Sequence, residues 1–258
     1  MHSDSSRLVT AHERLARLAE NFETLHHQEL LVLPNAWDAA SARVVEAAGF
    51  PAVATASAAI SAMLGYPDGE RTPVDEMFAA NARIARAVQL PVSMDAEGGY
   101  GLSPAALVSR LLEIGVVGCN LEDTDHHGGG LKDAETHAQW LSEVRSTADA
   151  AGVPLVINAR VDVFFSTSDV PEADRIAEAI RRGRLYRSAG ATCIYPIGVG
   201  AAGTLAALVA GIDSPINANT TAGLDLPGLR SLGVARVTYG PRFYRAGLDA
   251  FAAAIRNL

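Results

Sequence analysis

The sequence Pro-Val-Ser-Met-Asp-Ala-Glu-Gly-Gly-Tyr-Gly at residues 91–101 combines a short apolar segment, two acidic residues and a glycine-rich turn. The alternation of apolar and small residues behind a proline predicts a short buried strand. Side chains two positions apart on a strand point to the same side, so Asp95 and Glu97 are expected to converge on one point. Carboxylate oxygens gathered in this way suit a hard cation such as Mg²⁺. The alternative is that these carboxylates only cap the helix that follows.

A strand followed by a helix recurs along the whole chain. Apolar strands are predicted at residues 30–33, 52–56, 92–94, 116–121, 155–159, 192–196, 215–218 and 235–239, each with a helical segment after it. Continuous apolar strands are typical of a parallel sheet buried on both faces. Eight such units predict an α/β fold, a (β/α)₈ TIM barrel in one domain over residues 1–258. An open doubly wound sheet is disfavoured because no Gly-x-Gly-x-x-Gly follows the first strand.

Two segments lie outside this regular pattern. Residues 10–27 have apolar residues at helical spacing, which predicts a short N-terminal helix with Thr10 as its N-cap. This helix is expected to close the bottom of the barrel or to join a subunit contact. After the second strand, a long loop is predicted through residues 65–70 before the helix at 74–88.

Composition narrows the classes of function. The formal net charge of −8 argues against nucleic acid or an anionic membrane as the main partner. The first residues are polar and no apolar run is long enough to span a membrane, which predicts a cytoplasmic protein. Cys119 and Cys193 lie in predicted strands without zinc spacing and are expected to be reduced core thiols. Lys132 is the single lysine and lies in a glycine-rich loop, so Schiff-base chemistry is disfavoured.

Polar residues cluster at the carboxyl ends of the predicted strands, where TIM barrels place their active sites. Asp95, Glu97 and Glu122 follow adjacent strands and are expected to share one Mg²⁺, partly through water. Arg160, one strand further on, is expected to bind a substrate carboxylate; the alternative is a structural salt bridge to Asp162 or Glu122. A cation beside a guanidinium favours a small anionic substrate such as a 2-oxo acid, whose enolate Mg²⁺ would stabilise.

The chain resembles the isocitrate lyase/phosphoenolpyruvate mutase superfamily from about Leu31 to Ala250. The order and spacing of the matching motifs carry this resemblance. They are Asn35 with Ser41-Ala42-Arg43, Ala48-Gly49-Phe50, Leu64-Gly65-Tyr66-Pro67-Asp68, the 95–101 segment, Glu122-Asp123, Asn158-Ala159-Arg160-Val161-Asp162 and Asn217-Ala218-Asn219-Thr220.

The resemblance implies both an assembly and a set of site residues. It implies a barrel whose last helix is swapped between subunits of a homodimer or homotetramer, and an Mg²⁺ site, with Mn²⁺ as the alternative ion. The metal ligands implied are Asp95, Glu97 and Glu122. Ser57 and the amides of Ala58 and Ala59 would hold the substrate carboxylate and oxyanion together with Arg160, and Asp68 would lie near the reacting centre. The family usually shows glycines where this chain has Ala58-Ala59.

The loop after the fourth strand departs from two branches of that family. Isocitrate and methylisocitrate lyases resemble one another in a cysteine-containing loop, and the phosphonate-forming mutases in a Lys-x-Asn pair. Residues 123–132 contain neither cysteine nor that pair, which disfavours both reactions. His126 and His127 are the candidate proton donors there, on a loop made mobile by three glycines; the alternative is a solvated surface pair.

These observations predict an Mg²⁺-dependent carbon–carbon lyase that acts on an oxaloacetate-like or substituted 2-oxo acid through a pyruvate-type enolate. Trp37, at the end of the first strand, is a further candidate for substrate binding. Tyr195 and Asn219 are expected to orient the distal end of the substrate. The alternatives are phosphorus–carbon chemistry on phosphoenolpyruvate or phosphonopyruvate, and a non-catalytic barrel that binds a 2-oxo acid.

Overall fold

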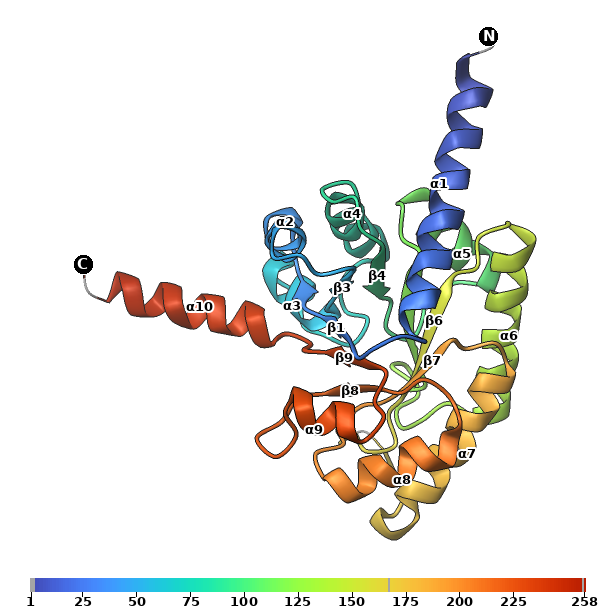
Figure 1. Ribbon diagram of the computed structural model, residues 1–258, viewed down its shortest axis with the longest axis vertical. Helices are drawn as coiled ribbons and strands as arrows, with labels where there is room; N and C mark the ends of the chain where they lie inside the picture. Colours follow the sequence, from blue (N-terminus) through green and yellow to red (C-terminus); the bar gives the residue numbers. More distant parts are fainter. Residues whose placement is uncertain (1–2, 167, 257) are drawn as a thin grey trace.

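Parallel strands form a closed barrel in the computed structural model, which describes residues 3–166, 168–256 and 258 (Figure 1). Six strands pair in the order β2-β3-β4-β5-β6-β7 and three in the order β1-β9-β8. β1 and β2 are consecutive parts of one stave, and a parallel bridge from Ile194 to Ile216 joins the two sheets. The predicted (β/α)₈ barrel is therefore confirmed. The strands are β1 (Leu31–Leu33), β2 (Asn35–Ala36), β3 (Val53–Thr55), β4 (Val92–Asp95), β5 (Gly118–Glu122), β6 (Val156–Val161), β7 (Cys193–Pro196), β8 (Asn217–Asn219) and β9 (Arg236–Thr238).

Helices surround the barrel, as expected for parallel strands joined by right-handed crossovers. Several begin at a side chain that accepts a hydrogen bond from the first turn, among them Asp38, Ser103, Asp133 and Asp225. The helices are α1 (Ser3–Leu25), α2 (Ala39–Ala47), α3 (Ser57–Leu64), α4 (Val74–Ala85), α5 (Pro104–Glu113), α6 (Ala134–Ala150), the 3₁₀ turn η1 (Glu172–Asp174), α7 (Arg175–Ser188), α8 (Ala202–Ile212), α9 (Leu226–Ser231) and α10 (Arg242–Ile255).

The N-terminal helix closes one end of the barrel. Phe22 of α1 is fully buried against strand residues. A Cβ at Gly118 would come within 2.7 Å of the Phe22 ring, so the strand needs glycine at this point. The Arg236 guanidinium, also fully buried, lies 5.7 Å from the centre of the same ring. The expectation that this helix covers the bottom of the barrel is confirmed.

Two sequence-based expectations about helices were wrong. α1 begins at Ser3, so Thr10 lies inside the helix and does not cap its start. The segment after β3 is not simply a loop, because α3 begins one residue beyond that strand. No side chain caps α3, so the sequence lacks the usual signal for a helix start. Its end does have a signal, since Gly65 terminates it with φ of 90°.

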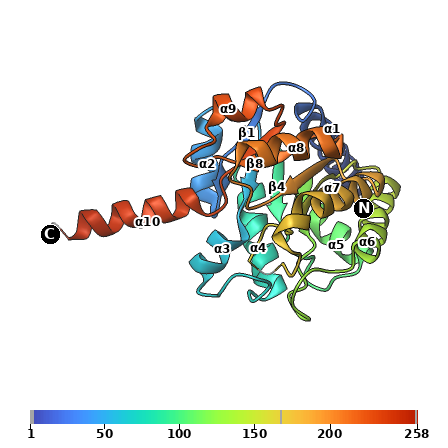
Figure 2. The ribbon, with the colours of Figure 1, turned by 90° about the horizontal axis from the view of Figure 1, so that it is seen from below.

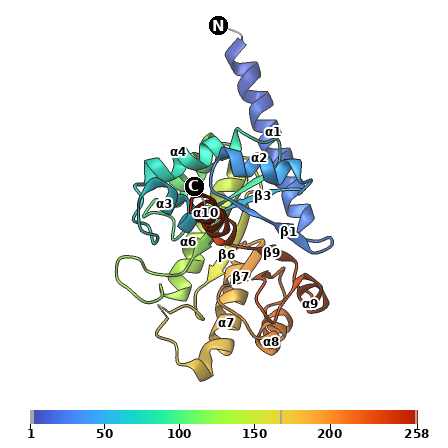
Figure 3. The same cartoon turned by 90° about the vertical axis from the view of Figure 1, so that its left-hand side faces the viewer.

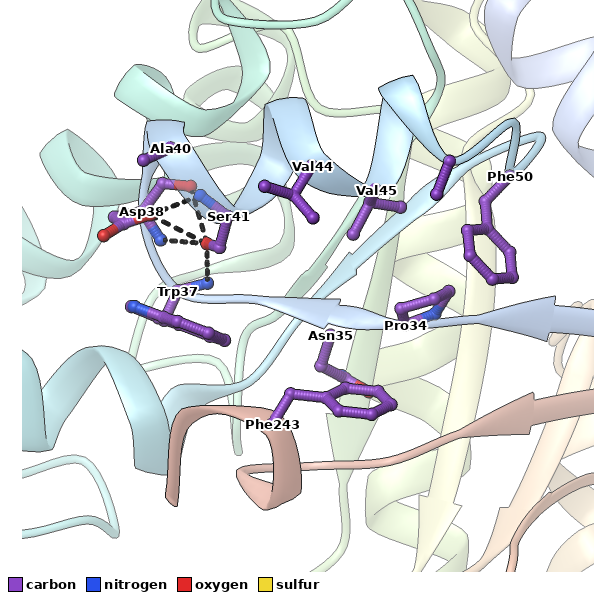
Figure 4. Close-up of a pocket in the computed structure, with 11 residues that line it drawn as sticks. Pro34, Asn35, Trp37, Asp38, Ala40, Ser41, Val44, Val45, Phe50 and Phe243 are labelled. Carbon is purple, nitrogen blue, oxygen red and sulfur yellow. Dashed lines mark hydrogen bonds between the residues drawn. The ribbon is translucent and has the colours of Figure 1, made fainter. Parts of the chain in front are cut away.

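The last helix projects away from the barrel (Figures 1 and 2), and it is seen nearly end-on in Figure 3. None of its described residues is buried, and its apolar side chains Phe243, Leu248, Phe251 and Ile255 are 39–63% exposed. An apolar groove of about 580 Å³ lies along α2 beside the start of α10, with Val44, Val45 and Phe50 on one wall and Phe243 on the other (Figure 4).

Other expectations concern the thiols and the membrane. Cys119 and Cys193 are free and buried, and burial raises the pKa of each thiol to about 12. Both are therefore inert core residues. Among the described helices, none combines the length and the apolar character that a membrane span requires.

Candidate active site

Strand register places three polar side chains in one row across the barrel. Asp95 on β4 pairs with Asn120 on β5, and Asn120 pairs with Asn158 on β6. Asn158 donates a hydrogen bond of 2.7 Å to Asn120, and Asn120 donates one of 3.3 Å to Asp95 Oδ1. This chain of amides fixes one oxygen of the Asp95 carboxylate, since each amide is oriented by the next.

The other oxygen of Asp95 is held by the start of α3. Asp95 Oδ2 accepts hydrogen bonds from the Ser57 amide at 3.0 Å and from its hydroxyl at 2.8 Å. The N-terminus of a helix attracts anions because its first amides point outward. Ser57 and Ala58 line the cavity described below, whereas the amide of Ala59 donates to Ala56 within the turn. Of the two predicted alanine amides, Ala58 is thus the one at the cavity.

A second row holds the predicted guanidinium between acidic partners. Glu122, Arg160 and Tyr195 pair across β5, β6 and β7. Arg160 forms a bidentate pair with Asp162 at 2.7 and 2.9 Å, and its Nη1 lies 2.5 Å from Glu122 Oε2. Burial acts to lower the pKa of Arg160, but these carboxylates outweigh it and hold that pKa well above its ordinary value. Both salt bridges of the alternative interpretation are therefore present, and Arg160 also lines the cavity.

Glu97 takes part in a contact between two loops, formed by Glu70, Glu97 and Tyr100, which we call the seam. Its carboxylate accepts hydrogen bonds from the Glu70 amide at 2.6 Å and from the Tyr100 hydroxyl. The Tyr100 amide in turn donates to the Glu70 carboxylate at 2.6 Å. These three residues have φ of 58° (Glu70), 48° (Glu97) and 54° (Tyr100), in the left-handed region that non-glycine residues rarely adopt. The seam holds the 65–70 loop, and with it Asp68, against the 97–101 turn.

Negative charge accumulates around this seam and favours a bound cation. Burial and, to a lesser extent, the carboxylates of Asp95, Asp68 and Glu122 raise the pKa of Glu97 to about 8, although the hydrogen bond from Tyr100 lowers it. Burial also raises the pKa of Glu122, while Arg160 opposes the shift. Oε2 of Glu122 is buried, and the Arg160 guanidinium 2.5 Å away is its counter-charge. A divalent cation would relieve this repulsion, so the donor set fits the group that the sequence predicts.

The carboxylates do not, however, form a ready cage of three direct ligands. In the described part of the chain, no three His, Cys, Asp or Glu side chains meet closely enough to hold a metal ion together. Asp95 lines the cavity, whereas Glu97 and Glu122 are 2% exposed and held by neighbouring groups. Of the three predicted ligands, Asp95 is therefore the one that could touch a cation in the cavity directly. Mg²⁺ commonly keeps several waters and binds few carboxylates, which suits this arrangement.

A cavity of about 290 Å³, which we call the inner cavity, opens at the carboxyl ends of the strands. Six predicted site residues line it: Ser57, Ala58, Asp68, Asp95, Arg160 and Tyr195. Burial raises the pKa of Asp68, and the Asp95 carboxylate raises it further. Asn219 lies just outside and accepts a 2.7 Å hydrogen bond from the Tyr195 hydroxyl. Trp37 lies elsewhere, on the groove along α2.

The two predicted histidines occupy different environments. His126 Nε2 lies 2.6 Å from Glu122 Oε1, and this hydrogen bond raises the pKa of the imidazole. His126 thus supports Glu122 from behind the cavity wall. The side chain of His127 is 83% exposed, 3.9 Å from Glu70. Neither ring lines the inner cavity, and a role as proton donor would require the loop to move.

Several residues that line the inner cavity were not selected from the sequence. Asn120 and Thr238 contribute polar side chains, Phe165 lies with its ring 5.1 Å from the Arg160 guanidinium, and Arg245 reaches in from α10. Position at a strand end could have identified Asn120 and Thr238. Arg245 lies one turn into a helix, and only the three-dimensional path of α10 brings it to the barrel mouth.

The chain is similar over most of its length to a known protein family and to solved structures. The sequence profile of a family described as phosphoenolpyruvate phosphomutase matches residues 22–258. A crystal structure from Burkholderia cenocepacia, named as a candidate phosphonomutase, is 36% identical with a TM-score of 0.84 and covers 92% of this chain and 98% of its own. A Corynebacterium glutamicum protein named as a candidate 2-methylisocitrate lyase is 32% identical over 75% of this chain and 63% of its own. An oxaloacetate decarboxylase of Rhodopseudomonas palustris is 31% identical over 70% of this chain and 62% of its own.

Proposed function

This chain belongs to the isocitrate lyase/phosphoenolpyruvate mutase superfamily, and we propose that it is a divalent-cation-dependent lyase that breaks a carbon–carbon bond in a small 2-oxo acid. The observation that carries the proposal is the inner cavity, where the Asp95 carboxylate, the Arg160 guanidinium and the start of α3 face one space at the carboxyl ends of the strands. A bound Mg²⁺ would polarise the 2-oxo group and stabilise the enolate formed when the bond breaks.

The protein side chains supply the remaining functions in this proposal. Arg160 and the Ala58 amide bind the substrate carboxylate, because both line the cavity and both offer N–H donors. With oxaloacetate the fragment that leaves is carbon dioxide: the electron pair of the broken bond forms the pyruvate enolate, with the charge on the carbonyl oxygen, and the enolate carbon then takes a proton. Asp68 is a suitable proton carrier, since its pKa is raised by burial and by Asp95.

Carbon–carbon cleavage is favoured over phosphorus–carbon chemistry by the 123–132 loop. Its single lysine, Lys132, donates hydrogen bonds to the carbonyl oxygens of Gly98 at 3.0 Å and Glu122 at 3.3 Å. These bonds direct the ammonium group to the backbone, and Lys132 is absent from the inner cavity. It is therefore poorly placed to hold a transferring phosphoryl group.

A substrate panel with Mg²⁺ tests this function. We expect purified protein to release pyruvate or a related product from oxaloacetate or a substituted 2-oxo acid, and to lose that activity in EDTA. Because Mg²⁺ alone decarboxylates oxaloacetate slowly, protein-free and Glu122→Ala samples serve as controls. Product analysis by NMR would contradict the proposal if only phosphonopyruvate and phosphoenolpyruvate were interconverted, or if chelation left turnover unchanged.

We also propose that α10 packs on a second copy of this chain. Its apolar stripe is exposed, and the groove along α2 offers an apolar surface beside its start. Exchange of this helix between two copies would cover both surfaces, as the resemblance implied. A homodimer or homotetramer would result, each a multiple of the 27.0 kDa chain.

Light scattering on a charged variant tests this assembly. Phe251→Asp places a carboxylate in the centre of the stripe and is expected to shift the particle mass toward one chain, because burying an unpaired charge is costly. Arg256→Asp, at the C-cap of α10 and outside the apolar stripe, is the control and should leave the mass unchanged. A wild-type protein that is already monomeric at micromolar concentration would contradict helix exchange.

A further inference from the structure

A second hollow continues from the inner cavity toward the last helix. This outer cavity has a volume of about 540 Å³. It shares Tyr195, Ile197, Gly240, Pro241 and Arg245 with the inner cavity, so the two meet at one wall. The Tyr195 hydroxyl, bonded to Asn219, marks the junction. A substrate with its 2-oxo end at Asp95 therefore has space beyond it, and Arg245 lies where the two spaces meet.

Arg245 differs from the other arginines at this mouth because its charge is free. Arg160 is held by Asp162 and Glu122. Arg242 donates hydrogen bonds to the Thr220 hydroxyl at 2.6 Å and to the Thr220 carbonyl at 2.5 Å. The Arg245 guanidinium forms no ion pair and no hydrogen bond with the described residues, even though Asp249 lies one turn further on and lines the same outer cavity.

We propose that Arg245 determines substrate specificity by binding a second anionic group on the end of the substrate away from the cation. This inference rests on the proposed function and narrows its substrate class to 2-oxo acids with a distal carboxylate. A guanidinium offers two parallel N–H donors to a carboxylate, a geometry that favours a two-pronged contact. A substrate with a single carboxylate leaves Arg245 without a partner.

Binding of two unreactive ligands in the presence of Mg²⁺ separates this role from the rest of the site. Oxalate has no extension beyond the group that chelates the cation, whereas 3,3-difluorooxaloacetate has a distal carboxylate. By calorimetry, Arg245→Gln should weaken difluorooxaloacetate binding roughly 10- to 100-fold and change oxalate binding less than about threefold. Arg245→Lys should recover part of the loss, because it keeps the charge but not the fork.

Arg242→Gln is the matched control, since it removes the same charge from the same helical turn but from a guanidinium already bonded to Thr220. It should leave the ratio of the two affinities near that of the wild type. The specific role of Arg245 would be overturned if Arg245→Gln weakened the binding of both ligands equally. It would also be overturned if Arg242→Gln weakened difluorooxaloacetate binding as much as Arg245→Gln does. If wild-type protein with Mg²⁺ bound neither ligand, the proposed function itself would fail and this inference with it.

Discussion

Asp95→Asn should lower kcat/KM for the 2-oxo acid substrate roughly 10³-fold or more, since it removes the carboxylate that reaches the cavity. The substitution is almost isosteric, but an amide has one acceptor oxygen where the carboxylate has two. It can accept a hydrogen bond from Ser57 or from the Asn120 NH₂ group, but not from both. The variant should also need more Mg²⁺ for half-maximal activity. Steady-state kinetics across a Mg²⁺ series measures both effects.

Asp75→Asn is the control for this experiment. Asp75 is an exposed carboxylate on α4 that pairs with Arg110 at 2.7 Å and does not line the inner cavity. Its loss should change kcat/KM less than twofold, because exposed pairs contribute little. If Asp95→Asn kept activity within tenfold of the wild type at every Mg²⁺ concentration, the cation would not be held at Asp95, and the chemistry proposed for the cavity would be wrong.

The barrel could be predicted from the sequence because strand and helix periodicity are local signals. Eight apolar strands separated by helical segments leave few arrangements. These local signals did not predict α3, because its first residue follows β3 almost directly and its start has no capping side chain. They also failed at Thr10, a residue type that caps helices but here lies within one. In both cases the surrounding chain, rather than the local residues, sets where the helix begins.

Site residues at strand ends could be predicted from the sequence. Residues whose position depends on the three-dimensional path of another element could not. Asp95 and Arg160 were found because parallel strands bring their carboxyl ends together. The two salt-bridge partners of Arg160, Asp162 and Glu122, were named from the sequence only as an alternative to substrate binding, and the structure has both. Arg245 could not be found at all, because it depends on the direction in which α10 leaves the barrel. The role of His127 stays a prediction, and its ring lies outside the cavity.

Beneath the site, Asp123 organises a buried network of hydrogen bonds. Its carboxylate is fully buried and accepts hydrogen bonds from the Asp162 amide at 2.8 Å, from Arg182 at 2.9 Å and from the Tyr186 hydroxyl at 2.8 Å. Burial raises the pKa of Asp123, while Arg182 and these donors oppose the shift. Because Asp162 in turn holds Arg160, the network connects α7 to the floor of the active site.

Asp123→Ala should lower the free energy of unfolding by about 3 kcal/mol. It leaves buried hydrogen-bond donors without an acceptor and the Arg182 charge without its buried partner. Glu178 still bonds Arg182 Nε at 2.7 Å, so we expect the lower end of the range for a broken buried pair. Chemical denaturation measures the loss. Asp125→Ala, two residues along the same loop but partly exposed, is the control and should cost less than about 1 kcal/mol.

A double variant tests why Asp123→Ala is destabilising. The cause is either the Arg182 charge left buried without its partner or the lost contacts of the Asp123 side chain. Asp123→Leu combined with Arg182→Met replaces the buried pair by apolar groups of similar volume, and should recover much of the stability lost in Asp123→Ala. Activity should not recover in full, because the Asp162 amide still lacks its acceptor and the Asp162 carboxylate that pairs with Arg160 loses that backbone anchor. Recovery of both stability and activity would mean that Asp123 serves only to pair with Arg182. A loss below 1 kcal/mol in Asp123→Ala would mean that the network contributes little to the fold.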